Sequence, residues 1–452
     1  MRIISPGRRH YLKYLPAPSP ARGAGYVRSR FLLCLETEEG TLLCNTLTGA
    51  LILLSREEAA LVSEEPRPLS PETEELAAGR FLVPASCREA AAADQLRALL
   101  LRLQAARREY TAYNILPTTF CNARCFYCYE SGLTHTRMTE ETADRLARFM
   151  AAHCGGRKVH LSWFGGEPLL GRDRIDQICR RLTELNVPFD SKMTSNAYLL
   201  DEALVRHAKE AWKLHNIQVT LDGTEEVYNR TKAYAGVRDN PYKRVLRNIS
   251  LLLDAGISVD IRLNMDSHNA ENLTELAGEL TALFRGRELL SVYVSPLNEG
   301  EGFTPVRHTE AERRLLERQL EDLRDTLSQS GWPQYRAEEL PALLAASCMA
   351  DNPGALQCTP DGVLSKCEDR LYEHPVGTVS EGVTDEAQAA FWRQRRSFDG
   401  CEACPLYPCC DRLLANCPVK TNRCTGYDKE HRIARYREIM LREYKRWKNS
   451  GM

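Results

Sequence analysis

The chain has 452 residues, of which 43% are hydrophobic and 27% charged, and this balance excludes disorder over most of its length. The 60 Lys and Arg residues nearly cancel the 61 Asp and Glu residues, so the net charge of −1 provides no basic field for nucleic acid or an anionic membrane. No apolar run reaches the roughly 18 residues of a spanning helix, and the N-terminus lacks the apolar core of a signal peptide. We therefore expect a cytoplasmic protein that binds neither nucleic acid nor membrane.

The first 88 residues predict a small unit of short strands and short helices. Residues 26–54 contain apolar runs of strand length separated by turns. Ser55 followed by Glu58 predicts a capping box and the start of a short helix. Together these segments resemble a small winged-helix unit. Residues 89–109 have a helical period and predict a connector to the next domain.

Residues 110–335 alternate strand and helix patterns. Six apolar runs, from TAYNILPT to LLSVYVSPL, are separated by helical stretches of about 12 to 20 residues. This alternation predicts an α/β fold with a parallel sheet and outer helices, either an open sheet or a partial barrel. Residues 336–427 are rich in Cys and poor in apolar runs, as expected of a small domain built on metal. Residues 428–452 predict one amphipathic helix.

The 17 cysteines are clustered, which in a cytosolic chain favours metal binding over disulfides. Nine lie between Cys348 and Cys424, and three lie in TTFCNARCFYCYE, directly after the first predicted barrel strand. Active sites of parallel α/β folds form at that end of the strands.

Cys121, Cys125 and Cys128 have C-x3-C-x2-C spacing. Three thiolates do not satisfy a structural zinc, which takes four ligands. A cubane iron–sulfur cluster held by three Cys fits better, because one iron is left open. A zinc site completed by a distant residue, or thiols that merely pack, is the alternative.

With Tyr127 before its last Cys, this triad resembles the signature of the radical S-adenosylmethionine (SAM) superfamily, in which it holds the catalytic [4Fe–4S] cluster. The segment SWFGGEPLL resembles the family's GGEP motif, whose backbone receives the SAM amino group. The segments TSNAYLL, QVTLDGTEEVYNRTK and DIRLNMDSHN resemble parts of the SAM pocket. The resemblance thus implies these cofactor-binding residues: Tyr127, Gly165, Gly166, Glu167, Pro168, Ser195, Asn196, Thr220, Asp222, Arg230, Arg262 and Asn264.

A strand-end Asp or Asn more often caps a helix than binds a ligand, so each short match is weak alone. All five segments occur in order, however, over about residues 110 to 300. The resemblance implies a partial (β/α)6 barrel of the TIM type with SAM as a cofactor.

The C-terminal cysteines resemble the SPASM domain, which carries two auxiliary [4Fe–4S] clusters. Carried over by position, the ligands of the inner cluster are Cys348, Cys367 and Cys417, with Cys358 as the candidate fourth. Those of the outer cluster are Cys401, Cys404, Cys410 and Cys424. Two features depart from the pattern: six residues separate Cys410 from Cys417 where the family has three, and Cys358 and Cys409 are additional, so either could replace a neighbour. A zinc ribbon is the alternative, although nine Cys are too many for one.

The resemblance implies an enzyme in which the reduced cluster cleaves SAM to a 5′-deoxyadenosyl radical that abstracts a hydrogen from an unactivated carbon. SPASM enzymes mostly modify peptides or proteins, and small winged-helix units bind the leader of a precursor peptide, often as an added edge strand. A stabilising cap is the alternative role of that unit.

We therefore expect a maturase of ribosomally made peptides that joins a Cys sulfur to a peptide carbon as a thioether. Its expected partners are the precursor peptide and an electron donor such as flavodoxin or ferredoxin. The alternatives are an anaerobic sulfatase-maturating enzyme, which makes formylglycine, and a non-catalytic iron–sulfur or zinc scaffold.

Overall fold

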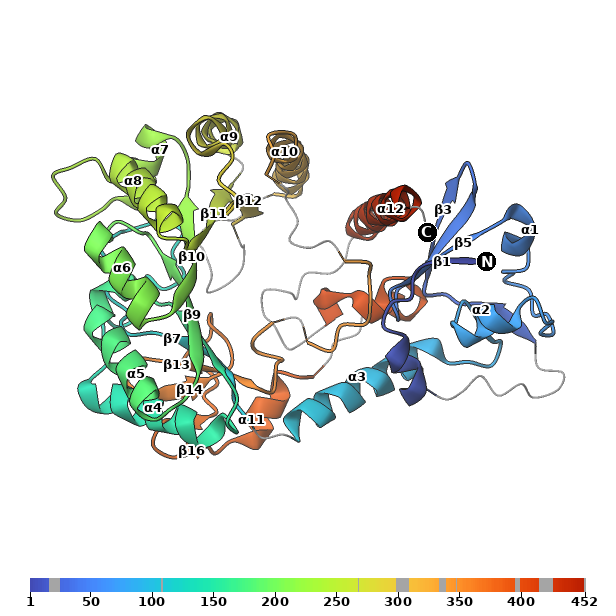
Figure 1. Ribbon diagram of the computed structural model, residues 1–452, viewed down its shortest axis with the longest axis horizontal. Coiled ribbons are helices and arrows are strands. Elements are labelled where there is room, and N and C mark those ends of the chain that lie inside the picture. The colour runs from blue at the N-terminus through green and yellow to red at the C-terminus, as the bar shows by residue number, and fades with distance from the viewer. Residues whose placement is uncertain are drawn as a thin grey trace. The chain divides into compact units, whose positions relative to one another are not determined.

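The computed structural model describes residues 1–15, 25–106, 109–266, 268–297, 309–332, 339–346, 348–394, 399–413 and 426–450 (Figure 1). The chain divides into two compact units, each made of several segments. The first unit contains Met1–Arg107, Ala337–Asn352 and Arg393–Met452, and the second contains Arg108–Arg336 and Pro353–Trp392. No helix in the described ranges is both long and apolar enough to cross a membrane.

The second unit is built on six parallel strands. They are β7 (Ala112–Ile115), β8 (Val159–Trp163), β9 (Phe189–Ser195), β10 (Leu214–Leu221), β11 (Ser258–Met265) and β12 (Leu290–Pro296). Each strand pairs with the next one in the chain, so the sheet has no point at which the strand order reverses. Such an order is that of a partial barrel, not of an open doubly wound sheet. The expected barrel is confirmed.

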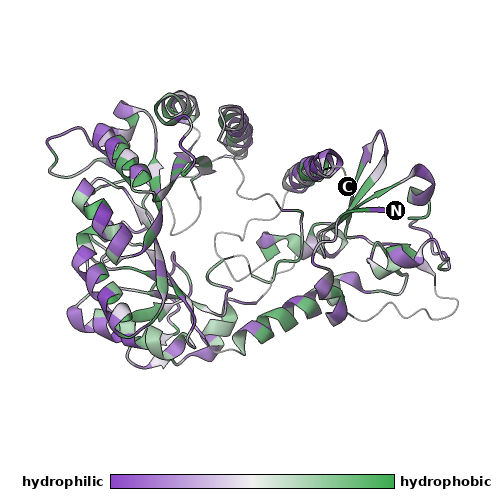
Figure 2. Cartoon of the chain, in the orientation of Figure 1, coloured by the Kyte–Doolittle hydropathy of each residue, from purple (hydrophilic) through white to green (hydrophobic). Residues whose placement is uncertain are grey.

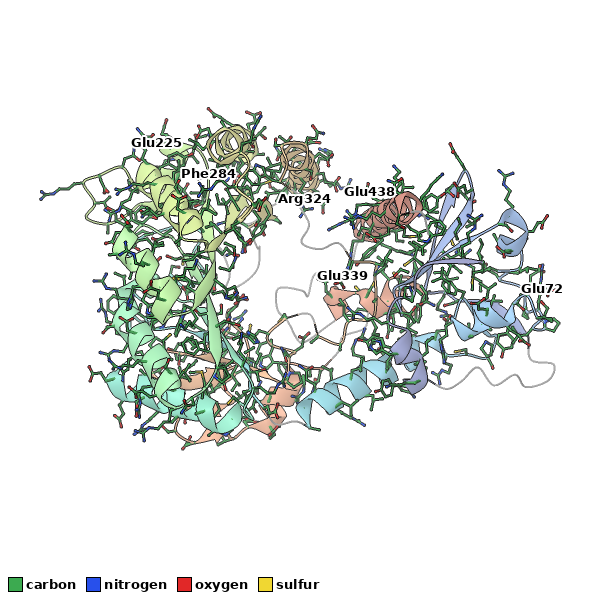
Figure 3. All side chains as sticks on the ribbon, in the orientation of Figure 1. Glu72, Glu225, Phe284, Arg324, Glu339 and Glu438 are labelled. Carbon is green, nitrogen blue, oxygen red and sulfur yellow. The ribbon has the colours of Figure 1, made fainter. Side chains whose placement is uncertain are left out.

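Amphipathic helices connect the strands and cover one face of the sheet (Figures 1 and 2). They are α4 (Glu140–His153), α5 (Arg172–Glu184), α6 (Glu202–Ala211), α7 (Glu225–Lys232), α8 (Pro241–Asp254), α9 (Ala270–Phe284) and α10 (Glu310–Gln329). Their apolar sides form one core with the sheet, which includes Phe284 at the end of α9 (Figure 3).

The barrel strands alternate between an apolar and a polar face. On β10, Ile217, Val219 and Leu221 are fully buried in the core shared with the helices. Gln218 and Thr220 point to the opposite face and line a cavity. Burying each large aliphatic side chain contributes about 1.5 to 3 kcal/mol, which fixes the register and leaves the polar side chains on the inner face of the barrel.

Part of the Cys-rich segment belongs to this sheet. β13 (Ala355–Cys358) lies parallel to β7, on the side away from β8. β14 (Val363–Ser365), β15 (Gly377–Thr378) and β16 (Gly382–Val383) continue the sheet as antiparallel strands, and α11 (Glu386–Phe391) follows.

The first unit contains an antiparallel sheet in the order β1 (Arg2–Ser5), β5 (Ala50–Leu54), β4 (Gly40–Asn45), β3 (Leu32–Thr37). A separate pair is formed by β2 (Tyr26–Arg28) and β6 (Leu82–Pro84). The helices are α1 (Arg56–Ala59), α2 (Glu74–Ala78), α3 (Glu89–Ala105) and α12 (Gly426–Asn449), with a 3-10 turn at Arg9–Tyr14. The capping box of Ser55 and Glu58 is confirmed at the start of α1.

The N-terminal sheet shares one unit with Cys401, Cys404, Cys409 and Cys410. Short 3-10 turns at Cys401–Ala403, Tyr407–Cys409 and Asp411–Leu413 pack with the sheet and α3. The Phe31 and Tyr407 rings stack with centroids 6.2 Å apart. The guanidinium of Arg97, on α3, donates to the carbonyls of Leu344 (2.7 Å) and Pro408 (2.8 Å). The first and last parts of the chain therefore fold together.

Candidate active site

A cavity of about 430 Å³ lies on the inner face of β7 to β11 and is bounded by the loops after β7 and β8. Six of the predicted cofactor residues line it: Tyr127, Gly165, Gly166, Thr220, Arg262 and Asn264. These six residues come from four of the five motif segments, which thus meet at one cavity.

The three cysteines of the triad lie on the loop after β7, and each is partly exposed. Burial raises the pKa of Cys121 to about 12 and that of Cys128 to about 11. Thiols of this kind become thiolates when a metal centre binds them. No three His, Cys, Asp or Glu side chains in the described part of the chain are spaced to hold one metal ion. An iron–sulfur cluster is wider than one ion, and three thiols on a single loop fit it.

The glycines after β8 allow two loops to lie against each other. Gly165 and Gly166 have φ values of +84° and +48°, which favour glycine. A Cβ on Gly166 would lie 2.2 Å from the Phe120 carbonyl oxygen, and one on Gly165 would lie 2.5 Å from the Leu116 side chain. The glycines are therefore needed for the close packing of these two loops, and both of them line the cavity beside the triad.

Glu167 joins the loops after β8 and β9 through hydrogen bonds and does not line the cavity. Its buried carboxylate accepts hydrogen bonds from the Ser195 hydroxyl (2.7 Å) and from the backbone N–H groups of Asn196 (2.8 Å) and Leu169 (3.1 Å). Burial raises the pKa of Glu167 to about 7. Pro168 is buried in the turn that follows. The structure therefore places these four predicted cofactor residues, Glu167, Pro168, Ser195 and Asn196, as supports of the cavity and not as its lining.

A buried lysine joins the triad loop to the ends of β10 and β11. Lys232 forms an ion pair with Asp222 (2.9 Å) and donates to the Tyr127 hydroxyl (3.0 Å) and the Thr220 hydroxyl (2.5 Å). The Asn264 amide donates to Tyr127 (3.0 Å) and Asp222 (2.9 Å). The motifs did not identify Lys232 as a site residue. The sequence feature that could have pointed to it is its position as the last residue of the matched segment QVTLDGTEEVYNRTK.

Arg230 does not join this group. Its side chain is 70% exposed and forms an ion pair with Glu226, one turn earlier on α7 (3.6 Å). Two residues along a helix correspond to a rotation of about 200°, so Arg230 and Lys232 point in opposite directions. The structure argues against Arg230 as a cofactor-binding residue.

The predicted auxiliary ligands have different environments. Cys348 is exposed, Cys401, Cys404 and Cys410 are partly exposed, and all four belong to the first unit. Cys367 is buried in the second unit, while Cys417 and Cys424 lie outside the described residues.

Cys358 and Cys409 pack as apolar side chains. On β13, Cys358 alternates with Gln357, which pairs with the cavity residue Asn114, so the Cys358 side chain points to the helix side of the sheet. It is fully buried in that apolar core. Cys409 is buried in a core with residues of α12 and the N-terminal sheet. This burial argues against Cys358 as the fourth ligand of the inner cluster.

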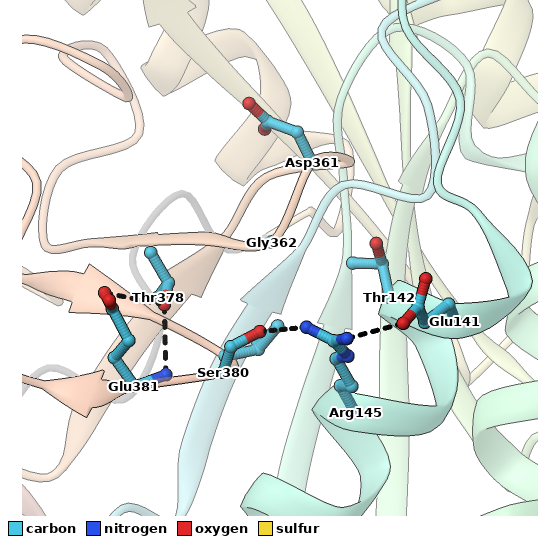
Figure 4. Close-up of a pocket in the computed structure, with 9 residues that line it drawn as sticks. Glu141, Thr142, Arg145, Asp361, Gly362, Thr378, Ser380 and Glu381 are labelled. Atoms are coloured by element: carbon cyan, nitrogen blue, oxygen red, sulfur yellow. Dashed lines mark hydrogen bonds and ion pairs between the residues drawn. The ribbon is translucent and has the colours of Figure 1, made fainter.

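A second cavity, of about 300 Å³, lies between the start of α4 and the β14–β16 hairpins (Figure 4). Its guanidinium, from Arg145, is engaged by the Ser380 hydroxyl and the Glu141 carboxylate, each at 2.5 Å. None of its lining side chains carries a buried polar atom without a partner. The first cavity, where such atoms occur on Tyr129, Glu130 and Arg262, is therefore the candidate site.

Comparison with known sequences identifies a domain within the chain. Residues 115–280 match the model of the radical SAM superfamily. GTP 3′,8-cyclase of Clostridium perfringens is 24% identical over 293 residues, which cover 62% of this chain and 87% of that protein. A probable GTP 3′,8-cyclase of Methanocaldococcus jannaschii is 30% identical over 155 residues, or 33% of this chain and 48% of that protein.

Solved structures share the fold. Native anSMEcpe with bound AdoMet and Cp18Cys peptide has a TM-score of 0.58 at 14% identity, over 75% of this chain and 99% of that chain. Streptococcus suis SuiB bound to precursor peptide SuiA has a TM-score of 0.51 at 15% identity, over 85% and 94%. The matched family model contains the cysteine triad and the cavity loops. Residues 115–280 are therefore a radical SAM domain, and the chain is an enzyme.

Proposed function

We propose that this enzyme modifies a ribosomally made precursor peptide and joins a Cys sulfur to a peptide carbon as a thioether. The observation that carries the proposal is the combination of a radical SAM cavity with an N-terminal antiparallel sheet that ends in two edge strands, β1 and β3. An edge strand can accept a further strand, which is one way in which a leader peptide binds. The likeness to SuiB, which extends beyond the barrel, supports this assignment.

Cys121, Cys125 and Cys128 would hold the catalytic [4Fe–4S] cluster, and the cavity beside the glycines would hold SAM. Bound together, the two supply a carbon radical that abstracts a hydrogen atom from the substrate. The residues of the chain position these groups and exclude water. Lys232 holds Tyr127 of the triad loop, and Glu167 fixes the glycine loop below the cavity.

We also propose two auxiliary [4Fe–4S] clusters held by the C-terminal cysteines, with flavodoxin or ferredoxin as the electron donor. Anaerobically reconstituted protein should then contain about twelve iron atoms per chain, four for each cluster. About four iron atoms, or zinc as the main metal, would contradict the auxiliary clusters.

The cyclase relatives suggest GTP as a second candidate substrate. The cavity lining combines the carboxyl groups of Glu130, Glu368 and Asp369 with the cationic side chains of Lys192 and Arg262, so its charge does not decide between a peptide and a triphosphate. Formylglycine formation is the alternative reaction on a peptide substrate, and its product is a formylglycine residue instead of a thioether.

For the test, short reading frames beside the gene are searched for one that encodes a Cys-containing peptide. Reconstituted enzyme, SAM and a reductant are incubated with that peptide, and the product is analysed by tandem mass spectrometry. A thioether requires the loss of two hydrogen atoms and a Cys that no longer reacts with iodoacetamide. The Cys121→Ala/Cys125→Ala/Cys128→Ala variant is the control and should form neither product nor 5′-deoxyadenosine. Conversion of GTP with the peptide left unchanged would refute the proposal.

A further inference from the structure

The antiparallel sheet of the first unit has two edge strands, and they differ as templates for a further strand. β1 has four residues, and its pairing with β5 is interrupted between Ile3 and Ser5. Short edge strands and bulges disfavour the addition of another strand. β3 has six residues and pairs with β4 without interruption. β3 is therefore the better template.

The backbone groups of β3 that point away from β4 form a surface that we call the β3 edge. Backbone groups of alternate residues in an edge strand point outward. The Arg437 guanidinium, on α12, donates to the Cys34 carbonyl (3.0 Å), so Cys34 belongs to the β3 edge, and Glu36, two residues later, belongs to it too (Figure 1). Among the residues that the structure describes, no other side chain bonds to these two backbones. A single exposed side chain thus covers the β3 edge.

Two guanidinium groups flank the β3 edge, one from each face of the sheet. Arg28, on β2, donates to the Cys34 thiol (2.8 Å), which packs with the core formed by α2. Arg437 comes from α12, which packs on the opposite face. Burial raises the pKa of Cys34, so its thiol is neutral and gives Arg28 no counter-charge. The nearby carboxylate of Glu36 accepts from the Thr41 hydroxyl (3.0 Å). Within the described part of the chain, neither guanidinium forms an ion pair.

Apolar side chains lie beside the β3 edge on both faces. Leu35 is partly exposed and packs with Ile433 and Tyr436 of α12. Cys34 and Val62 are partly exposed on the other face. An added strand directs its side chains alternately to the two faces, where each meets an apolar contact and a guanidinium. The β3 edge is therefore complementary to an extended segment with apolar and acidic side chains.

We propose that the β3 edge binds an extended acidic segment of the precursor peptide as a fifth strand, and that Arg28 and Arg437 pair with its carboxylates. A backbone N–H of the peptide takes over the Cys34 carbonyl, and Arg437 is released to an acidic side chain. This assignment rests on the proposed function and selects one of the two edges. Binding at β1 is the alternative outcome of the test.

The location is tested by amide hydrogen exchange of the full-length reconstituted enzyme. The probe is the leader portion of the Cys-containing peptide encoded beside the gene, added at a saturating concentration. Strand pairing slows the exchange of the amides it engages. We expect slower exchange in Leu32–Thr37 and unchanged exchange in Arg2–Ser5.

The charge contacts are tested by fluorescence anisotropy with the same leader, labelled with fluorescein. A second leader has its Asp and Glu replaced by Asn and Gln. Wild type is compared with Arg28→Met and Arg437→Met, and Arg446→Met is the matched control, since Arg446 is exposed on α12 and pairs with Glu443 (2.7 Å). Circular dichroism and iron content confirm that each variant folds and carries its clusters.

We expect Arg28→Met and Arg437→Met each to weaken the acidic leader by at least about tenfold, and Arg446→Met to leave it unchanged. The neutral leader should bind wild type weakly, and the two variants should bind it no more weakly than wild type does, because no carboxylate remains to lose its partner.

Slower exchange in Arg2–Ser5 in place of Leu32–Thr37, or in neither strand, overturns the proposal. A neutral leader that binds wild type as tightly as the acidic one overturns it as well. A peptide that protects β3 but stays unmodified counts against the proposed function alone. A peptide that is modified at full rate while β3 stays unprotected counts against the β3 edge alone.

Discussion

Replacing Lys232 by Met tests the assignment made from the structure against the one made from the motif. The motif assigns a role at the SAM site to Arg230, whereas the structure places Lys232 there. In the wild type, Lys232 and Asp222 are buried and lie 2.9 Å apart, with side chains 3% and 2% exposed. Removing one partner of a buried ion pair costs about 3 to 5 kcal/mol, since the other charge is left uncompensated. Asp222 would keep its bonds from Tyr127 and Asn264, so we expect the lower end, about 3 kcal/mol.

Arg230→Met is the matched control, two residues away on the same helix. Its ion pair with Glu226 is exposed, and such pairs contribute about 0.3 to 0.5 kcal/mol. The free energy of unfolding is measured by urea denaturation, and SAM affinity by equilibrium dialysis. We expect Lys232→Met to lower both strongly and Arg230→Met to change neither. Equal losses in the two variants, or a cost below about 1 kcal/mol for Lys232→Met, would refute this reading of α7.

Three further substitutions test the surrounding structure. Gly166→Ala should lower both SAM binding and the iron content, because the new Cβ would meet the Phe120 carbonyl 2.2 Å away and displace the triad loop; dialysis and iron analysis of the reconstituted variant measure this. Arg97→Met should destabilise the first unit by about 3 kcal/mol, since two charge-assisted bonds to backbone carbonyls are lost, and thermal denaturation of that variant should show an early transition. The pKa of Glu167 rises from 4.5 to about 7 on folding, so the folded protein binds the proton more tightly. The free energy of unfolding should then fall by about 3 kcal/mol as the pH rises from about 4.5 to about 7, and Glu167→Gln should lack that part of the slope in urea titrations at pH 5 and 7.5.

The barrel could be predicted from sequence because each strand carries its own signal. All six predicted runs coincide with β7 to β12, and the run SVDIRLNM coincides with β11 residue by residue. Buried parallel strands read as apolar runs, and the helices between them have a clear period. The motif residues follow the C-terminal ends of these strands, which lie at one end of a barrel. The sequence therefore also predicts that the motif residues lie close together.

The roles of individual residues could not be predicted in the same way. A motif gives the position of Glu167, but only the fold shows that its carboxylate accepts bonds from the loop after β9. The rotation of α7 about its axis decides whether Arg230 or Lys232 points to the buried Asp222. The residue types at these two positions do not predict that rotation. Cys358 looked like a ligand because it lies among other cysteines, yet strand alternation directs it into the apolar core.

The domain organisation shows a similar limit. A contiguous segment was expected to form the Cys-rich domain, but the described residues divide it between the two units. The cause is long-range pairing: β13 adds to the edge of the barrel sheet beside β7, while Tyr407 packs on Phe31 near the start of the chain. Such pairings join residues hundreds of positions apart in the sequence, so the periodicity of a local segment does not predict them.

The triad loop is held by other loops of the barrel as well as by hydrogen bonds within itself. The Phe120 carbonyl accepts the backbone N–H of Glu167, in the loop after β8 (2.9 Å). The Asn122 side chain accepts the amide of Asn196, after β9 (2.7 Å), and its backbone carbonyl accepts the N–H of Ala235, after α7 (2.9 Å). The position of the three thiols is thus set by two strand-to-helix connections and the loop between α7 and α8 together. A cofactor that reacts through a radical requires its groups to be placed closely, and a site on a single free loop would not supply that precision. The strand order of the barrel, which brings these connections to one end, is therefore the feature that makes the cysteine motif chemically useful.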